Sequence, residues 1–179
     1  MTMQAPALDL RYPIGQFEYA QPYSLPERAQ KIRDIEDCPA KLRAAVSGLN
    51  QTQIDTPYRD GGWTVRQTVH HIADSHINSF IRFRFALTED NFVVKPYNEK
   101  LWAELPDVRE PVEVSLQLLE ALHHRWIVML KALTPEQWKR TMNHPEFGPL
   151  TLDKALGLYS WHSRHHVAHI TGLRKRMNW

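Results

Sequence analysis

Apolar residues recur at helical spacing along several long segments of the chain. The apolar stripe of residues 65–87 consists of Val65, Val69, Ile72, Phe80, Phe83 and Leu87. The stripe of residues 111–133 consists of Leu119, Leu122, Trp126, Met129, Leu130 and Leu133. Positions three and four apart share one face of a helix, so each segment predicts an amphipathic helix. Residues 152–177 predict another helix, interrupted in composition only by Gly157 and Gly172.

Capping residues and prolines mark where these helices begin and break. Ser24 with Glu27, and Thr64 with Gln67, form capping boxes, and Thr151 precedes the last helix. Pro39 is expected to kink or break the first helix before it resumes along residues 42–49. A short helix carrying Trp138 should follow Thr134 and Pro135, and residues 144–149 form a turn-rich loop with room for a brief hairpin.

The connections are long, but the chain shows no second domain. Residues 88–111 link two helices, and connections of that length are usually functional or partly ordered. Residues 1–23, with three prolines and four aromatic residues, predict an extended arm packed on the body. Because no alternating strand patterns or repeats appear, we expect one all-α domain over residues 1–179, a helical bundle with this N-terminal arm.

Composition narrows the class of protein. The chain of 179 residues is 42% hydrophobic and 23% charged, with no apolar run long enough to span a membrane. The N-terminus lacks the features of a secretory signal, and Cys38 is the only cysteine, so we expect a soluble cytoplasmic protein without disulfides. A net charge of +2 without a basic stripe argues against nucleic-acid binding.

Four histidines fall within eight residues of the last predicted helix. On a helix, His162 lies beside His166, and His165 lies beside His169. Buried imidazoles need partners, and a divalent metal satisfies two at once. The better-known zinc motif places a general-base Glu after its first histidine, whereas this chain has Ser163 there, so the metalloprotease mechanism does not transfer.

An open metal site needs a third ligand from a neighbouring helix. The best supplier is the pair His70 and His71, near the start of the helix at 65–87. Helical periodicity alone does not choose between these two histidines. We expect His76 to face the core and His123 and His124 to lie on the surface.

The motifs as a set resemble a known family. Residues 60–67 (Asp-Gly-Gly-Trp-Thr-Val-Arg-Gln), the following His70-His71-Ile72-Ala73-Asp74, and residues 161–170 (Trp-His-Ser-Arg-His-His-Val-Ala-His-Ile) resemble the two signature helices of the DinB-like superfamily. Together with Tyr12-Pro13-Ile14-Gly15 they are similar to its YfiT-type branch, whose members are proposed metal-dependent hydrolases. The resemblance runs nearly end to end.

The resemblance implies a fold, a metal and its ligands. It implies a four-helix bundle of up-down-down-up topology that binds one zinc or nickel ion through three histidines. The family's first ligand stands eight residues after the helix-opening tryptophan, which is His71 here, and the other two correspond to His162 and His166. His165 and His169 would then lie around the ligands or at the rim. A cytoplasmic homodimer is also implied.

Three functions remain open from the sequence. A metal held by neutral imidazoles activates bound water, which favours hydrolysis of a small-molecule substrate. DinB-like relatives also include transferases that attach a low-molecular-weight thiol such as bacillithiol to electrophiles, and Arg66, Arg164 or the loop with Lys95, Tyr97 and Lys100 would be available for an anionic thiol. The third is a non-catalytic bundle in which His165 completes the metal sphere. The general acid or base stays unknown, with Asp74 and His165 as weak candidates.

Overall fold

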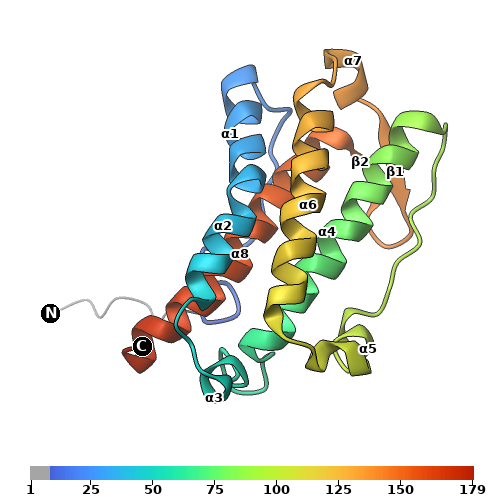
Figure 1. Ribbon diagram of the computed structural model, residues 1–179. Coiled ribbons are helices and arrows are strands. Elements are labelled where there is room, and N and C mark those ends of the chain that lie inside the picture. The colour runs from blue at the N-terminus through green and yellow to red at the C-terminus, as the bar shows by residue number, and fades with distance from the viewer. Residues whose placement is uncertain (1–8) are drawn as a thin grey trace, which may run out of the picture.

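Four helical rods pack lengthwise against one another in the computed structural model, which describes residues 9–179 (Figure 1). The rods are α1 (Leu25–Glu36) continued by α2 (Cys38–Val46), then α4 (Val65–Thr88), α6 (Val112–Lys131) and α8 (Leu152–Met177). Short elements join them: α3 (Gln51–Ile54), α5 (Glu99–Trp102), the 3₁₀ turn η1 (Pro106–Arg109), α7 (Pro135–Trp138), β1 (Thr141–His144) and β2 (Gly148–Thr151). The fold is therefore a mostly helical four-helix bundle with one small hairpin.

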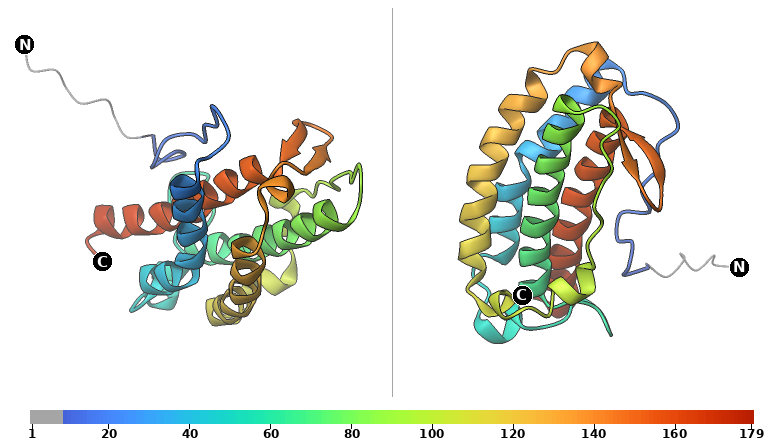
Figure 2. Two further views of the ribbon diagram at one scale, coloured as in Figure 1. Left: turned by 90° about the horizontal axis from the view of Figure 1, so that it is seen from above. Right: turned by 90° about the vertical axis from the view of Figure 1, so that its right-hand side faces the viewer.

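The long connection after α4 determines the topology. Residues 89–98 run back along the bundle to α5, so α4 and α6 start at the same end and lie side by side in parallel (Figures 1 and 2). The rod α1–α2 and the last helix α8 run the opposite way (Figure 1). This is the up-down-down-up order that the resemblance implies.

The predicted helix starts are present as hydrogen-bonded caps. Thr64 Oγ1 accepts from the backbone N–H of Gln67 at 3.1 Å, and Gln67 Oε1 accepts from the backbone N–H of Thr64 at 3.0 Å. Thr151 Oγ1 accepts from the backbone N–H of Lys154 at the start of α8. These caps satisfy amide groups that have no partner inside the helix. They fix the first turn of both helices that carry the candidate ligands.

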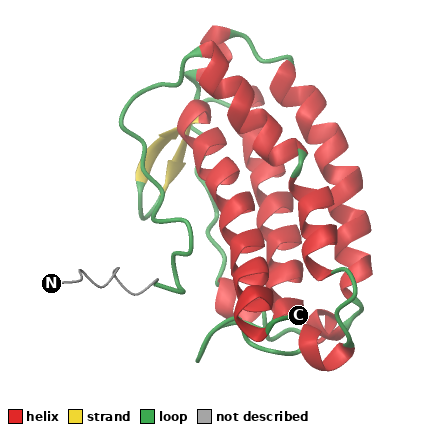
Figure 3. Ribbon diagram, turned by 90° about the vertical axis from the view of Figure 1, so that its left-hand side faces the viewer, coloured by secondary structure: helices red, strands yellow, loops and turns green. Residues whose placement is uncertain are grey.

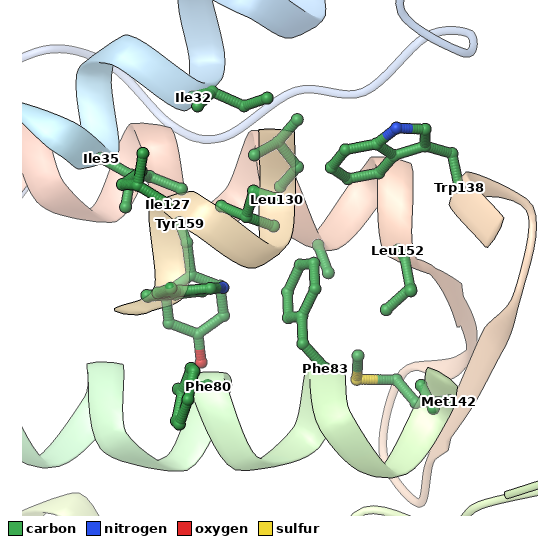
Figure 4. Packing of buried hydrophobic residues seen from close by; sticks show 14 of the residues in the cluster. Ile32, Ile35, Phe80, Phe83, Ile127, Leu130, Trp138, Met142, Leu152 and Tyr159 are labelled. Carbon is green, nitrogen blue, oxygen red and sulfur yellow. The ribbon is translucent and has the colours of Figure 1, made fainter. Parts of the chain in front are cut away.

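Two apolar clusters fill the bundle, one toward each end. The first includes Phe83, Trp126 and Leu156, and its packing is shown in Figure 4. The second includes Leu42, Val69 and Ile170. A layer of histidine side chains from α4, α6 and α8 lies between the two clusters along these helices. The two apolar clusters therefore pack on either side of the histidine layer and fix the helices that carry it.

The N-terminal arm and the hairpin pack against the outside of the bundle (Figures 2 and 3). Asp153 on α8 anchors the arm, because its carboxylate accepts from the Tyr19 hydroxyl at 3.1 Å and from the Tyr23 backbone N–H at 2.8 Å. Trp161 donates its indole N–H to the carbonyl of Gly15 at 3.0 Å. The predicted arm is thus present over residues 9–23, whereas residues 1–8 lie outside the described part of the chain.

The hairpin pairs Thr141 with Thr151 in an antiparallel register. The strand β1 also forms backbone hydrogen bonds with the loop that follows α4. The N–H of Asn143 donates to the carbonyl of Phe92, and the N–H of Val94 donates to the carbonyl of Asn143. The returning loop is therefore attached to the bundle through the hairpin. Over residues 9–179, none of the helices combines the length and the apolar character that a membrane crossing requires.

Candidate metal centre

Three imidazoles from two helices meet in the histidine layer. His71 comes from α4, and His162 and His166 come from consecutive turns of α8. One ligand nitrogen from each lies within 4.8 Å of the others, and Nε2 of His71 is 3.2 Å from Nε2 of His162. The geometry brings together the three residues that the resemblance singled out.

The three rings are held by aromatic contacts and differ in exposure. Trp63 packs its ring against His71 with centroids 4.4 Å apart, and the His162 and His166 rings meet edge to face at 4.4 Å. His71 and His166 are 5% and 8% exposed, whereas His162 keeps intermediate exposure. The cluster is therefore rigidly packed on the inner side and reaches solvent beside His162.

Burial keeps these imidazoles in the free-base form. Desolvation is the main cause that lowers the pKa of His71 to about 4, with a smaller contribution from His169. The pKa values of His162 and His166 are also lowered well below the ordinary value, again mainly by desolvation and then by the neighbouring histidines. A metal ligand must be a neutral imidazole, so the cluster has the required protonation state at neutral pH.

The donor set fits a divalent transition metal. In a tetrahedral site with metal–nitrogen bonds of about 2.0–2.1 Å, two ligand nitrogens stand about 3.3 Å apart. The 3.2 Å separation of the His71 and His162 Nε2 atoms matches that spacing. Imidazole nitrogen suits zinc, nickel, copper and iron, which the residue types alone do not separate.

Two other groupings of possible ligands are weaker. In the group of Cys38, His76 and His123, burial raises the pKa of the Cys38 thiol to about 12, which opposes the thiolate that a metal would need. The facing nitrogens of His76 and His123 are 2.8 Å apart, the distance of a hydrogen bond. The group of His165, His166 and His169 shares His166 with the main cluster.

His165 does not join the main cluster. Its ring stacks on Trp161 with centroids 4.2 Å apart, and its Nδ1 has no hydrogen-bond partner within residues 9–179. It groups with His166 and His169 rather than with His71 and His162. The geometry therefore gives no support to His165 as the fourth ligand of a closed metal sphere.

Among the expectations about single residues, the surface position of His123 needs correction. His124 is exposed as expected, but His123 is only 2% exposed, because its ring bonds the Ile35 carbonyl and His76 inside the bundle. His169 is buried beside His166, which is the first of the two positions expected for it, around the ligands rather than at the rim. Asp74 is half-buried, and desolvation, followed by the charge of Asp107, raises its pKa to about 6. The core position expected for His76 is confirmed, with 0% exposure.

The two arginines considered for an anionic thiol are engaged in other contacts. Arg66 donates to Asp55 at 2.7 Å, to Gln51 and to the carbonyl of Glu110. Arg164 forms an ion pair with Asp34 at 3.3 Å. These contacts favour a structural role for both arginines.

Curated relatives match the chain over almost its whole length. A protein of Bacillus cereus (strain 03BB102) named "Putative metal-dependent hydrolase" is 58% identical over 171 residues, which cover 96% of this chain and 99% of the relative. A protein of Bacillus thuringiensis subsp. konkukian with the same description is also 58% identical, with the same coverage.

Solved structures agree with this relationship. YfiT from Bacillus subtilis, described as "a probable metal-dependent hydrolase with an unusual four-helix bundle topology", superposes with a TM-score of 0.92 at 50% identity, covering 95% of this chain and 98% of its own. TT2238, a four-helix bundle protein, shares the fold alone, with a TM-score of 0.56 at 19% identity. The family model of the DinB superfamily matches residues 34–170. The chain therefore belongs to the DinB superfamily, as a close homologue of YfiT.

Proposed function

We propose that this protein is a metal-dependent hydrolase whose metal is held by His71, His162 and His166. The observation that carries the proposal is the convergence of three neutral imidazoles from α4 and α8 within 4.8 Å, beside a partly exposed His162. The names of the relatives from Bacillus support the same activity.

The residues around the centre have distinct tasks in this proposal. His71, His162 and His166 would hold a divalent metal, which would supply an activated water by lowering its pKa from about 15.7 toward about 7. Trp63 packs against the His71 ring and restricts its orientation. The exposed side of His162 is where a small-molecule substrate would approach.

Zinc or nickel is the metal we propose. Both accept imidazole nitrogen, and the ring nitrogens of His71 and His162 already stand at a suitable spacing. Elemental analysis of protein purified without added metal and without chelator would identify it, with about one ion per chain as the expected result.

Single substitutions test the ligand assignment. His71→Ala, His162→Ala and His166→Ala should each lose most of the bound metal and the hydrolysis of a panel of esters and amides. His124→Ala is the matched control, since it removes an exposed histidine from α6. Full metal occupancy in the His162→Ala protein would rule out the assignment.

A second assay separates hydrolysis from thiol transfer. The same metal-loaded protein would be incubated with a low-molecular-weight thiol and a model electrophile. Thiol conjugation without ester or amide hydrolysis would replace the proposed reaction with S-transfer, and metal binding without either reaction would indicate a binding protein. The homodimer stays a prediction, which sedimentation would test.

A further inference from the structure

A chain of histidine contacts leads away from the candidate metal centre into the core. The Nδ1 atom of His162 is 3.2 Å from Nε2 of His76, and Nδ1 of His76 is 2.8 Å from Nε2 of His123. The chain ends where Nδ1 of His123 meets the carbonyl oxygen of Ile35 at 2.7 Å. Three imidazoles from α8, α4 and α6 are thus connected to the backbone of α1.

Pro39 leaves the Ile35 carbonyl without its usual helical donor. In a continuous helix, that carbonyl would accept from the amide of the residue four positions later, which is Pro39. Proline has no backbone N–H, so the helical donor is missing. His123 supplies a donor in its place, and the break between α1 and α2 therefore orients a histidine on α6.

The carbonyl sets the direction of every hydrogen bond in the chain. A carbonyl oxygen only accepts, so Nδ1 of His123 must carry a proton. Burial lowers the pKa of His123 to about 4, so the ring is neutral and its Nε2 must accept from Nδ1 of His76. By the same reasoning, buried His76 accepts at Nε2 from Nδ1 of His162. His162 then carries its proton on Nδ1, and its unprotonated Nε2 faces Nε2 of His71 at 3.2 Å.

A second, shorter chain gives the same result for His166. The Nε2 atom of His169 is 3.2 Å from the carbonyl oxygen of Arg11 in the N-terminal arm, and its Nδ1 is 3.3 Å from Nδ1 of His166. His169 is only 3% exposed, and its ring nitrogens meet a carbonyl and an imidazole rather than a carboxylate, so this ring is neutral too. His169 donates to Arg11 and accepts from His166, which leaves Nε2 of His166 unprotonated.

We propose that His76, His123 and His169 are positioning residues that set the tautomers of His162 and His166 for metal binding. The proposal rests on the metal site proposed above. Each series of hydrogen bonds ends at a backbone carbonyl, one in α1 and one in the N-terminal arm. At its other end, each leaves the Nε2 atom of a ligand histidine unprotonated. Partners that fix the ring and tautomer of a ligating histidine are a general feature of metal sites, and their loss typically lowers metal affinity about 10–100-fold.

The tautomers are measurable without any metal. In chelator-treated protein labelled with ¹⁵N-histidine, the nitrogen chemical shifts should show Nδ1–H forms for His76, His123, His162 and His166, and an Nε2–H form for His169. A proton on Nε2 of His162 or His166 in the native protein would overturn the proposal. Since this measurement needs no metal, it separates failure of the tautomer proposal from failure of the proposed function.

Paired substitutions test the effect on metal affinity. His76→Leu removes the acceptor for His162, so the His162 proton should move to Nε2, and metal affinity should fall about 10–100-fold. His76→Gln keeps an oxygen acceptor near the former Nε2 and should retain the Nδ1–H form with most of the affinity. Equal losses in both variants would mean that His76 acts only through packing, contrary to the proposal.

The second chain offers an independent pair if the core substitution does not fold. His169→Leu should weaken metal binding, and His169→Asn should restore it, because Asn places an oxygen near the former Nδ1. His70→Leu is the matched control: His70 is buried on α4 and bonds Ser115 at 2.7 Å and the Glu110 carbonyl at 3.0 Å, outside both chains. Weaker metal binding in His70→Leu than in His169→Leu would contradict the proposal.

Discussion

At the scale of single residues, Asp74 is a candidate for proton exchange near the candidate centre. It lies one helical turn after His71, and its pKa is raised to about 6, mainly by desolvation. If it accepts a proton during hydrolysis, kcat/KM should rise with pH through about 6, and Asp74→Asn should lower it about 10²–10⁴-fold. Asp60→Asn, which changes an exposed loop carboxylate, is the control. An unchanged pH profile in Asp74→Asn would exclude this role.

The residues of the site differ in how far the sequence could predict them. His162 and His166 stand at helical spacing, and the resemblance selects His71, so the cluster was predictable. The burial of His123 could not be predicted in this way. His123 bonds the carbonyl of Ile35, a distant residue whose carbonyl lacks its helical donor because Pro39 has no backbone N–H. Helical periodicity describes one segment at a time and contains no information about such long-range partners.

At the scale of elements, Gly157 provides the space in which the arm meets α8. A Cβ atom at this position would clash with the hydroxyl and ring of Tyr23. Alanine stabilises an exposed helix by about 1 kcal/mol relative to glycine, but here the rigid ring would have to move. Gly157→Ala should therefore destabilise the native protein in urea unfolding. In a Tyr23→Ala background the same change should become stabilising, and a destabilisation that persists there would refute the steric explanation.

Asp153 is the anchor that joins the arm, α1 and α8. Besides its contacts to Tyr19 and Tyr23, it forms an ion pair with Arg28 at 2.7 Å, with side chains only 14% and 5% exposed. Removal of one partner from a buried ion pair costs about 3–5 kcal/mol. Asp153→Ala should lower the free energy of unfolding by that order, whereas Asp37→Ala, which breaks the exposed pair with Lys41, should cost less than about 1 kcal/mol. Comparable losses would contradict the anchoring role.

The elements themselves were largely predictable, and their docking was not. Capping residues and apolar stripes gave the starts of α4 and α8, and Pro39 indicated the helix break, which falls at Asp37 between α1 and α2. The attachment of the returning loop to β1 depends on backbone bonds between Phe92, Val94 and Asn143, which involve main-chain atoms only. Side-chain patterns therefore gave no indication of this contact.

At the scale of the whole molecule, the buried histidine layer should make stability depend on pH. The pKa values of His71 and His123 are lowered to about 4 by desolvation, from an ordinary value of 6.5 in the unfolded chain. Between pH 6.5 and 4 the unfolded state therefore binds protons that the native state does not, so stability falls as the pH falls. Each such histidine contributes about 1.4 kcal/mol per pH unit in this window.

Urea unfolding of chelator-treated protein at pH 7.5, 6.0 and 5.0 would measure this effect. We expect the free energy of unfolding to change little above pH 7 and to fall steeply below 6.5, offset in part by Asp74, whose raised pKa acts in the opposite direction. His123→Gln removes one titrating ring, so its stability should decline less steeply, by about 1.4 kcal/mol per pH unit. Added metal should move the loss of stability to lower pH, because the metal competes with protons for the same nitrogens. A flat profile from pH 7.5 to 5.0 without metal would show that the histidine layer takes up protons while still folded, and would contradict the lowering of these pKa values by burial.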